Sequence, residues 1–255
     1  MGLTQHQVEQ FADQGYLILP GLIAEERRTR YVALFDGLVE RSRSLTAADG
    51  GFHLAFDDAG QPIPGRLHKV QGVAVVEPRV LEIAAEPGIV AAVSALLGPD
   101  LDVFGTKFYP MNVTGATSTG WHQDNHYFGT RSDRVVSCAI YFHDTDAANG
   151  CLRVAPGTHR AGELVQHKRG DGIYSHGAWT PVADSDAVDV VCPAGTVVLF
   201  SANLLHGARP NCSGRPSYRT AWHYIPADLD LELFRRGEYE DRHWLGACKS
   251  SRSEN

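Results

Sequence analysis

The stretch Trp121-His122-Gln123-Asp124-Asn125-His126-Tyr127-Phe128 places an imidazole and a carboxylate two positions apart. Residues i and i+2 of an extended strand point to the same face, so we expect His122 and Asp124 to converge on one side of a strand. Gln123 and Asn125 alternate with them and should face away. A lone His-x-Asp is commonly surface or capping polarity, and it lacks one ligand for a facial metal site. The rest of the chain must therefore supply a third ligand.

A second stretch, Leu204-Leu205-His206-Gly207-Ala208-Arg209-Pro210-Asn211, offers that ligand. Two histidines and one carboxylate, leaving three coordination positions open, suit non-haem Fe(II) oxygenases. Four other histidines compete for the role: His126, His143, His159 and His223. We expect each of these four to be a hydrogen-bonded structural residue, with His126 also a candidate for the wall of a substrate pocket.

The length of 255 residues suits one large domain or two small ones, with 43% hydrophobic and 21% charged residues. We expect a single domain with a helical N-terminal part (about 1–100), a barrel core (about 101–226) and a C-terminal tail. The net charge of −7 gives no electrostatic signal for nucleic acid or an anionic membrane. These features favour a small-molecule substrate, and oligomeric state leaves no mark on the sequence.

The first ten residues are polar, and the chain contains no run of 18 apolar residues. We therefore expect neither a secretory signal nor a membrane span, and a cytoplasmic protein. The five cysteines are odd in number and none has zinc-like spacing, which indicates reduced and mostly buried thiols.

The hydrophobic pattern changes from helical to strand spacing near residue 101. Apolar periodicity predicts helices over Thr4–Gln14, Glu25–Arg43 and Arg79–Leu97, and a short strand over Tyr16–Leu19. Residues 44–65 resemble a loop, and 66–71 begin a strand. Further strands are expected at 103–109, 121–128, 134–143, 151–154, 188–192, 196–200 and 218–225. This order predicts a mainly β protein with flanking α-helices, built on a barrel or jelly roll.

Residues 160–186 form a polar, glycine-rich insertion between two expected barrel strands. The segment is either a tolerated surface insertion or a lid over the barrel mouth, and the sequence favours neither.

Four motifs together resemble the phytanoyl-CoA dioxygenase family of Fe(II)/2-oxoglutarate-dependent oxygenases. They are Val8-Glu9-Gln10-Phe11 with Gly15-Tyr16, Trp121-His122-Gln123-Asp124, the stretch from Asn149 to Arg160, and His206-Gly207-Ala208 with Pro210-Asn211. The resemblance covers nearly the whole chain. It implies a double-stranded β-helix (jelly-roll, cupin-like) core, in agreement with the strand pattern.

The resemblance implies that His122, Asp124 and His206 bind Fe(II) and form the catalytic centre, with 2-oxoglutarate and O2 as cosubstrates. The family's 2-oxoglutarate arginine falls at Ser217 here, with Arg215 and Arg219 on either side. We favour Arg219 because it lies inside the clear strand. Ala208 replaces a serine that is common in the family. Lys69 resembles a family lysine that reaches the cosubstrate, but it is equally compatible with an exposed strand end.

A carboxylate at Asp124 favours hydroxylation, because related halogenases carry a small residue there. We therefore expect an enzyme that hydroxylates or otherwise oxidises an unactivated C–H bond of a small metabolite, in secondary metabolism. Two alternatives remain: a cupin-like metal enzyme that does not use 2-oxoglutarate, and a non-catalytic jelly-roll binding module. The cupin-like alternative remains open because the arginine expected to bind 2-oxoglutarate is not at the family's usual position. The complete set of His122, Asp124 and His206 argues against a non-catalytic module.

Overall fold

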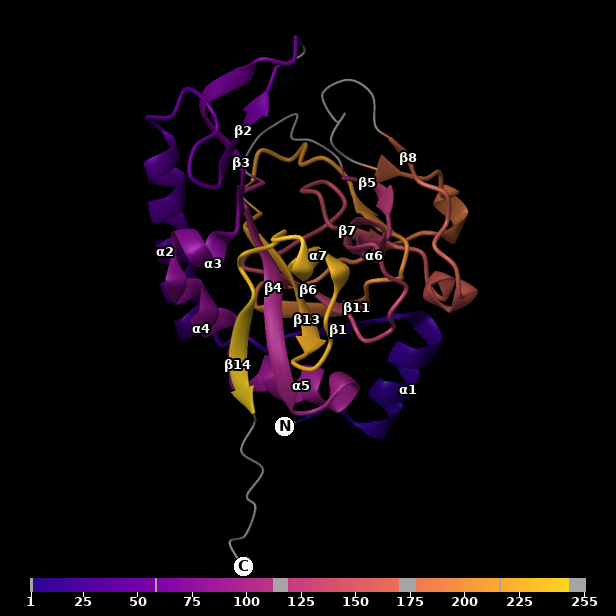
Figure 1. Cartoon of the computed structure of the whole chain (residues 1–255). Helices are drawn as coiled ribbons and strands as arrows, with labels where there is room; N and C mark the ends of the chain where they lie inside the picture. The colour runs from indigo at the N-terminus through magenta and orange to yellow at the C-terminus, as the bar shows by residue number, and fades with distance from the viewer. Residues whose placement is uncertain (1, 58, 112–118, 170–177, 216, 248–255) are drawn as a thin grey trace, which may run out of the picture.

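The computed structural model describes residues 2–57, 59–111, 119–169, 178–215 and 217–247, and two β-sheets dominate it (Figure 1). The larger, called the major sheet, is antiparallel. Its order is β1 (Tyr16–Leu19), β11 (Thr196–Ser201), β6 (Val136–Tyr141), β13 (Arg219–Pro226), β4 (Asp100–Tyr109), β3 (Pro62–Gln71) and β2 (Phe52–Phe56), and β14 (His243–Ala247) also pairs with β4. The smaller, called the minor sheet, has the order β10 (Val188–Asp189), β7 (Leu152–Val154), β12 (His206–Ala208) and β5 (Thr119–His122).

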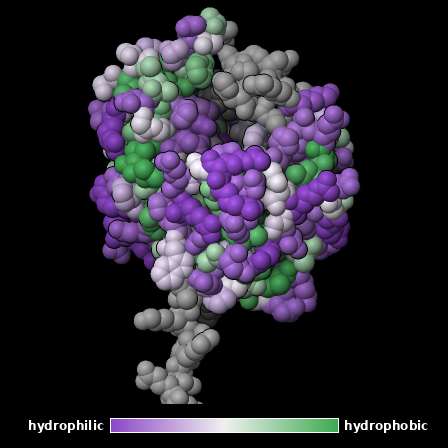
Figure 2. Space-filling view, in the orientation of Figure 1, coloured by the Kyte–Doolittle hydropathy of each residue, from purple (hydrophilic) through white to green (hydrophobic). Residues whose placement is uncertain are grey.

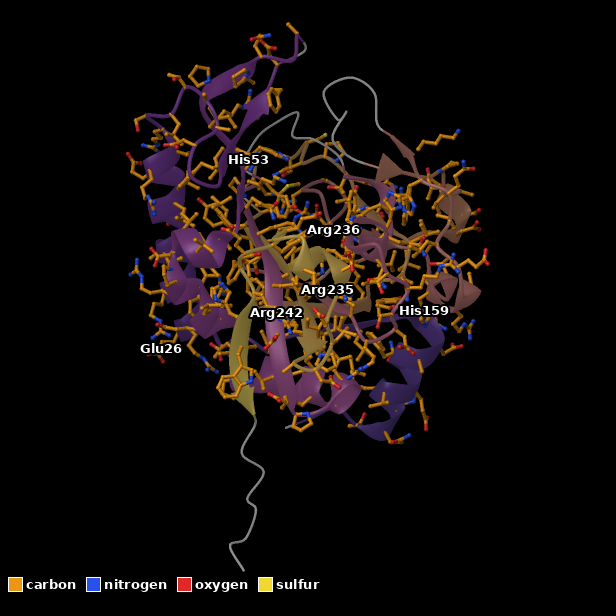
Figure 3. The ribbon with its side chains drawn as sticks, in the orientation of Figure 1. Glu26, His53, His159, Arg235, Arg236 and Arg242 are labelled. Atoms are coloured by element: carbon orange, nitrogen blue, oxygen red, sulfur yellow. The ribbon has the colours of Figure 1, made fainter. Side chains whose placement is uncertain are left out.

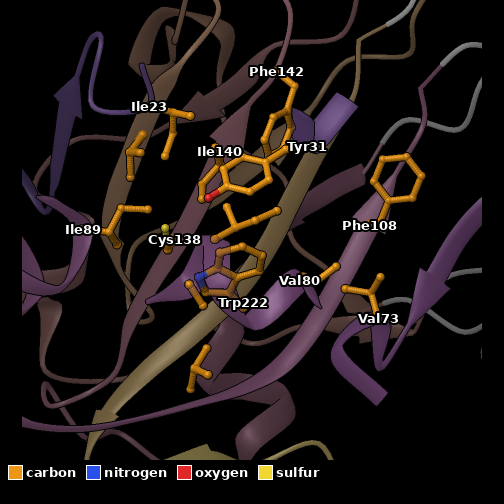
Figure 4. Packing of buried hydrophobic residues seen from close by; sticks show 14 of the residues in the cluster. Ile23, Tyr31, Val73, Val80, Ile89, Phe108, Cys138, Ile140, Phe142 and Trp222 are labelled. Carbon is orange, nitrogen blue, oxygen red and sulfur yellow. The ribbon is translucent and has the colours of Figure 1, made fainter. Parts of the chain in front are cut away.

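The two faces of the major sheet bury different sets of side chains. The outer face packs against helices α2 (Glu25–Ser42), α4 (Leu81–Ala84) and α5 (Pro87–Leu97), and Trp222, Phe142 and Tyr31 lie in this layer (Figure 4). The inner face packs on the minor sheet through Ala139, Tyr141, Val198 and Phe200 of the major sheet with Leu152 and Val154 of β7. Two facing sheets with helices outside one of them form the predicted jelly roll.

The N-terminal elements follow the expected local signals. Helix α1 (Gln5–Gln14) begins after Thr4, which forms a capping box with Gln7, and ends at Gly15 in the left-handed region with φ of 82°. Strand β1 follows at once and pairs with β11, which carries the start of the chain into the major sheet. These two elements and α2 confirm the predictions for residues 4–43.

Two predictions for residues 44–97 were wrong. Residues 44–65 are not a loop, because β2 and the first part of β3 form a hairpin there; the irregular register and several glycines and prolines hide its alternation. Residues 79–97 are not one helix. A 3₁₀ turn (Pro78–Val80), α4 and α5 replace it, because Pro87 lacks the amide hydrogen that a continuous helix needs and starts a new helix instead.

The remaining short elements complete the described chain. They are α3 (Val73–Val76), α6 (Asp124–Phe128), α7 (Glu232–Arg235), the 3₁₀ turns Thr158–Ala161 and Asp184–Asp186, and the paired strands β8 (Lys168–Arg169) and β9 (Ala178–Trp179). Within the described residues, no single helix is long and apolar enough to cross a membrane. One pair, Pro78–Ala84 with Pro87–Leu97, passes by length and composition but is bent by 63°.

Candidate metal and cosubstrate site

His122, Asp124 and His206 come together at the mouth of the two sheets. One ligand atom from each lies within 4.8 Å of the others, and all three side chains are buried. His206 of β12 is the direct cross-strand partner of His122 of β5, which explains how a residue so distant in sequence joins the pair. This is the three-residue cluster predicted from the sequence.

The strand predicted over residues 121–128 is shorter than expected. Strand β5 ends at His122, Gln123 is extended (φ −116°, ψ 129°), and Asp124 is the first residue of α6. The chain leaves the sheet because the Asn125 amide donates to the Ala202 carbonyl and a carboxylate is favourable in the first turn of a helix. Because Gln123 is extended, the side chains of His122 and Asp124 still lie on the same side. The prediction that these two side chains converge was therefore correct, although the strand ends at His122.

Backbone carbonyls orient both imidazoles. The Nδ1 atom of His122 lies 2.8 Å from the Gly120 carbonyl, and that of His206 lies 3.0 Å from the Leu204 carbonyl. A carbonyl only accepts, so each Nδ1 carries a hydrogen, and in the neutral ring Nε2 is the nitrogen with the lone pair. The Nε2 atoms lie 3.5 Å and 3.7 Å from the Asp124 carboxylate oxygens. Two neutral nitrogens and one carboxylate directed at one point fit a divalent iron.

The charges in this cluster are arranged to keep Asp124 ionised. Burial opposes its charge, but His206, His223 and His122 together hold the pKa of Asp124 well below its usual range. Burial, followed by the neighbouring His122, lowers the pKa of His206 to about 4. An ionised Asp124 beside a neutral His206 is what metal binding requires of these two groups.

Gln123 and Asn125 face away from the cluster, as expected. The Gln123 amide group donates to the Asn203 carbonyl at 2.7 Å and accepts from the Val165 amide at 2.9 Å. Its backbone amide donates to Nε2 of His167 at 3.0 Å. Asn125 donates to the side chain of Asn203 at 2.7 Å. These contacts attach the start of the 160–186 insertion to the segment that follows His122. The lid interpretation of this insertion stays a prediction, because residues 170–177 lie outside the described residues.

Arg219 lies deep on the inner face of the major sheet, flanked by two tyrosines. Its direct cross-strand partners are Tyr109 on β4 and Tyr141 on β6. The guanidinium donates to the Gly150 carbonyl at 2.8 Å, contacts the Met111 sulfur at 3.3 Å, and lies 5.6 Å from the centre of the Tyr109 ring. In the described part of the chain it forms no ion pair with a carboxylate. A buried cation of this kind lacks the anion that would normally balance it.

Two hydroxyl groups, near the start of β13 and on β6, have no acceptor for their hydrogen among the described residues. The Tyr141 hydroxyl is buried against the Leu152 backbone, and it donates to no described residue. The hydroxyl of Ser217, at the position of the family's arginine, is likewise buried and unbonded within the described residues. Buried hydroxyls are normally satisfied, so the region around Arg219 has donors available for a polar ligand.

The other two cosubstrate candidates differ from Arg219. Arg215 is exposed and pairs with Asp146 at 2.6 Å, so the surface already neutralises its charge. Lys69 is half-buried on β3 and donates to Gln71 at 3.2 Å, two positions along the same face. Gln71 is paired with Lys107 of β4, which turns Lys69 toward the inner face. Burial, followed by Lys107, lowers the pKa of Lys69 to about 8.

Two of the four competing histidines form hydrogen bonds with the backbone. His159 lies beside α1 and contacts the Ala12 carbonyl at 3.1 Å (Figure 3), and Nδ1 of His143 accepts from the Tyr218 amide at 3.1 Å. His126 is exposed and stacks on His167. His223, however, lies 3.7 Å from the Asp124 carboxylate. Sequence reasoning missed Ser137 and Tyr141, which alternate with Ala139 on one face of β6 but do not stand out within an apolar strand.

Comparisons with known proteins agree with this geometry. The model of the phytanoyl-CoA dioxygenase (PhyH) family matches residues 11–221. Peroxisomal phytanoyl-CoA dioxygenase of Bos taurus is 32% identical over 251 residues, covering 90% of this chain and 72% of that protein. Ectoine dioxygenase of Stutzerimonas stutzeri (strain A1501) is 27% identical over 241 residues, covering 88% and 76%.

A solved structure shares the fold across almost its full length. The non-heme alpha ketoglutarate dependent carbocyclase SnoK from nogalamycin biosynthesis superposes with a TM-score of 0.72 at 19% identity, covering 96% of this chain and 97% of that one. The family model spans most of the chain, and the predicted motifs lie in the predicted fold. The chain therefore belongs to the phytanoyl-CoA dioxygenase family of Fe(II)/2-oxoglutarate-dependent oxygenases.

Proposed function

We propose that His122, Asp124 and His206 hold Fe(II), that Arg219 binds the distal carboxylate of 2-oxoglutarate, and that the enzyme hydroxylates or otherwise oxidises an unactivated C–H bond of a small metabolite. Iron bound at this cluster supplies the activation of O2 that couples oxidation of 2-oxoglutarate to oxidation of the substrate. The donor set supports the metal assignment, because both Nε2 lone pairs and the ionised carboxylate face one point.

The observation that carries the cosubstrate assignment is the buried Arg219 between Tyr109 and Tyr141. Two small residues, Ala139 and Ala221, follow on the same inner face and are direct cross-strand partners. Their small side chains lie between Arg219 and the row of Ser137 and His223, next to Asp124. A short dicarboxylate fits this arrangement, with one end at the arginine and the other toward the metal cluster.

A small-molecule substrate is supported by the relatives, which include proteins named for the small metabolite ectoine. The face shown in Figure 2 is mostly hydrophilic, and its apolar residues are scattered among the described ones rather than gathered in one broad patch. We propose secondary metabolism as the setting, and the carboxylate of Asp124 supports hydroxylation over halogenation.

The decisive experiment measures succinate released from 2-oxoglutarate by the iron-loaded enzyme across a metabolite library. We expect turnover with at least one small metabolite, and its loss in His122→Ala, Asp124→Ala and His206→Ala, because each removes a ligand. His159→Ala is the matched control, since this histidine lies beside α1, away from the cluster. Unchanged iron affinity and activity in Asp124→Ala would refute the site, and substrate oxidation without 2-oxoglutarate would favour the cupin-like alternative.

A further inference from the structure

A line of polar side chains runs behind Asp124 on the inner face of the major sheet. The Ser137 hydroxyl lies 2.6 Å from the Asp124 carboxylate and 2.9 Å from Nδ1 of His223. On the other side of the ring, Nε2 of His223 lies 3.4 Å from the Lys107 ammonium group, a long contact. Ser137 and His223 are direct cross-strand partners on β6 and β13, and Lys107 lies on the neighbouring β4. Three adjacent strands thus build one path to the carboxylate.

The donors and acceptors of this path match in one direction only. The Ser137 hydroxyl has a single hydrogen and donates it to Asp124, so Nδ1 of His223 carries the ring hydrogen and Nε2 faces Lys107 as an acceptor. That Nδ1–H donates to the Ser137 oxygen, and the Ser137 hydroxyl donates to the ionised carboxylate. Each group uses its donor on the next one, and Asp124, at the end, needs only to accept. A hydrogen-bonded path in which every donor meets an acceptor keeps its side chains in one orientation.

The aromatic packing around His223 fixes the ring that connects the path. Its ring centre lies 4.7 Å from that of Phe128 and 5.3 Å from that of Phe104. Gly105 adds a further constraint, because a Cβ atom there would lie 2.9 Å from Cδ2 of His223. The ring is therefore held by packing as well as by hydrogen bonds.

We propose that Ser137 and His223, with Lys107 behind them, are positioning residues that fix the plane of the Asp124 carboxylate for the metal. The inference rests on the proposed function, since it assigns a role toward the metal held there. Rotation about the last bond of an aspartate side chain is broad, and Asp124 stands on a helix of only five residues. Without the Ser137 hydroxyl, the carboxylate plane loses its only short side-chain hydrogen bond among the described residues. Groups that orient a ligand in this way typically affect metal affinity about 10- to 100-fold.

The test measures anaerobic binding of Co(II) in the absence of 2-oxoglutarate, so that it does not depend on turnover. Co(II) also reports its geometry through its visible absorption. We expect Ser137→Ala to raise the Co(II) Kd about 10- to 100-fold and to change the spectrum. The matched control is Thr220→Val, which removes another buried hydroxyl, on the opposite face of β13, that has no partner among the described residues. A Kd for Ser137→Ala within twofold of the wild type would overturn the proposal.

A double-mutant cycle separates positioning from a general structural effect. His223→Phe keeps a ring between Phe104 and Phe128 but removes Nδ1. We expect the double variant Ser137→Ala/His223→Phe to bind Co(II) about as weakly as Ser137→Ala alone, because the second change breaks a path that is already broken. Effects that multiply would mean that the two residues act separately, contrary to the proposal.

A second measurement does not require the variants to fold. Nitrogen-15 NMR of the metal-free wild type should show His223 with its hydrogen on Nδ1, and a hydrogen on Nε2 would overturn the relay. The metal measurements also separate the two proposals. If the wild type binds no Co(II), the metal site fails. If the wild type binds and His206→Ala does not, while Ser137→Ala binds normally, only the positioning role fails.

Discussion

At the scale of single residues, the two candidate arginines differ in what surrounds them. Arg219 is buried without an acidic partner in the described chain, whereas Arg215 is exposed and paired with Asp146. We predict that Arg219→Ala weakens 2-oxoglutarate binding by about 2–5 kcal/mol, which is roughly a thirtyfold to several-thousandfold rise in KM, because a buried carboxylate would be left unpaired. Arg215→Ala should change KM little. A titration of 2-oxoglutarate followed by succinate formation checks both, and the reverse order would move the contact to Arg215.

Lys69 gives a pH-dependent prediction. Burial, followed by Lys107, lowers its pKa to about 8, so its ammonium charge is present below that pH and lost above it. If the charge contacts 2-oxoglutarate, binding should be strongest below pH 8 and weaken as the pH rises toward 9.5. Lys69→Met should bind about tenfold more weakly at pH 7 and show little change over this range. The measurement is the Kd for 2-oxoglutarate at each pH, and parallel curves for the two proteins would exclude Lys69 from the contact.

The three residues proposed as ligands could be identified from the sequence because their chemistry is visible in the residue types. Two histidines and an aspartate in the family's order identify the cluster without a structure. Ser137 and Tyr141 were not predictable in the same way, because a serine or tyrosine in an apolar strand has no distinctive spacing. Their importance comes from the register that places Ser137 opposite His223 and Tyr141 opposite Arg219. A single sequence does not contain that register.

At the scale of elements, an irregularity in β4 directs Lys107 toward the site. The register with β13 shifts between Ala221 and His223, beside Gly105 and Thr106. The Asp241 carboxylate holds the irregularity, because it accepts from the backbone amides of both residues and from the Thr106 hydroxyl at 2.9 Å. A C-terminal segment thus fixes the shape of a strand that lines the site.

Gly105 is the residue that this irregularity requires. Its φ of +63° favours glycine, and a Cβ atom would collide with His223 and Tyr239. We predict that Gly105→Ala lowers the free energy of unfolding by about 2–4 kcal/mol, from backbone strain and displaced neighbours. Gly21→Ala has a similar φ of +68° with nothing within 4 Å, so it should cost only about 1 kcal/mol. Urea unfolding measures both, and equal losses would show that packing around His223 is loose.

The failed predictions at this scale have separate physical causes. Helix α1 and strand β1 were predicted correctly because capping and periodicity are local signals. The hairpin of β2 and β3 was missed because its pairing slips twice, which breaks the alternation that identifies a strand. Strand β5 was drawn too long because the contact that ends it, from the Asn125 amide to the Ala202 carbonyl, joins distant parts of the chain.

At the scale of the whole molecule, one face of the major sheet packs against the helices and the other face carries the residues of the candidate site. Alternate residues of β6 and β13 face opposite sides, so Cys138, Ile140 and Trp222 join the layer of helices while Ser137, Tyr141 and Arg219 face the minor sheet. The jelly-roll class was predictable from many short strands after a helical start. The sequence did not predict which face of the sheet carries the site, because this depends on which face the helices cover.

This division yields a prediction that compares two aromatic residues on one sheet. Trp222 is fully buried against the helices, and its indole donates to the Tyr224 hydroxyl at 3.0 Å. Trp222→Phe should lower the free energy of unfolding by about 1–3 kcal/mol through a cavity and a lost hydrogen bond, with KM for 2-oxoglutarate unchanged.

Tyr141→Phe should do the opposite. It removes a hydroxyl that donates to no described residue, so the free energy of unfolding should change by less than about 1 kcal/mol. The same hydroxyl lies on the strand beside Arg219 and is free to donate to a bound carboxylate, so KM for 2-oxoglutarate should rise roughly tenfold. Urea unfolding and a 2-oxoglutarate titration of both variants form a two-by-two comparison. If Trp222→Phe changed KM as much as Tyr141→Phe, the outer layer would contribute to the site, and the two faces of the sheet would not be independent.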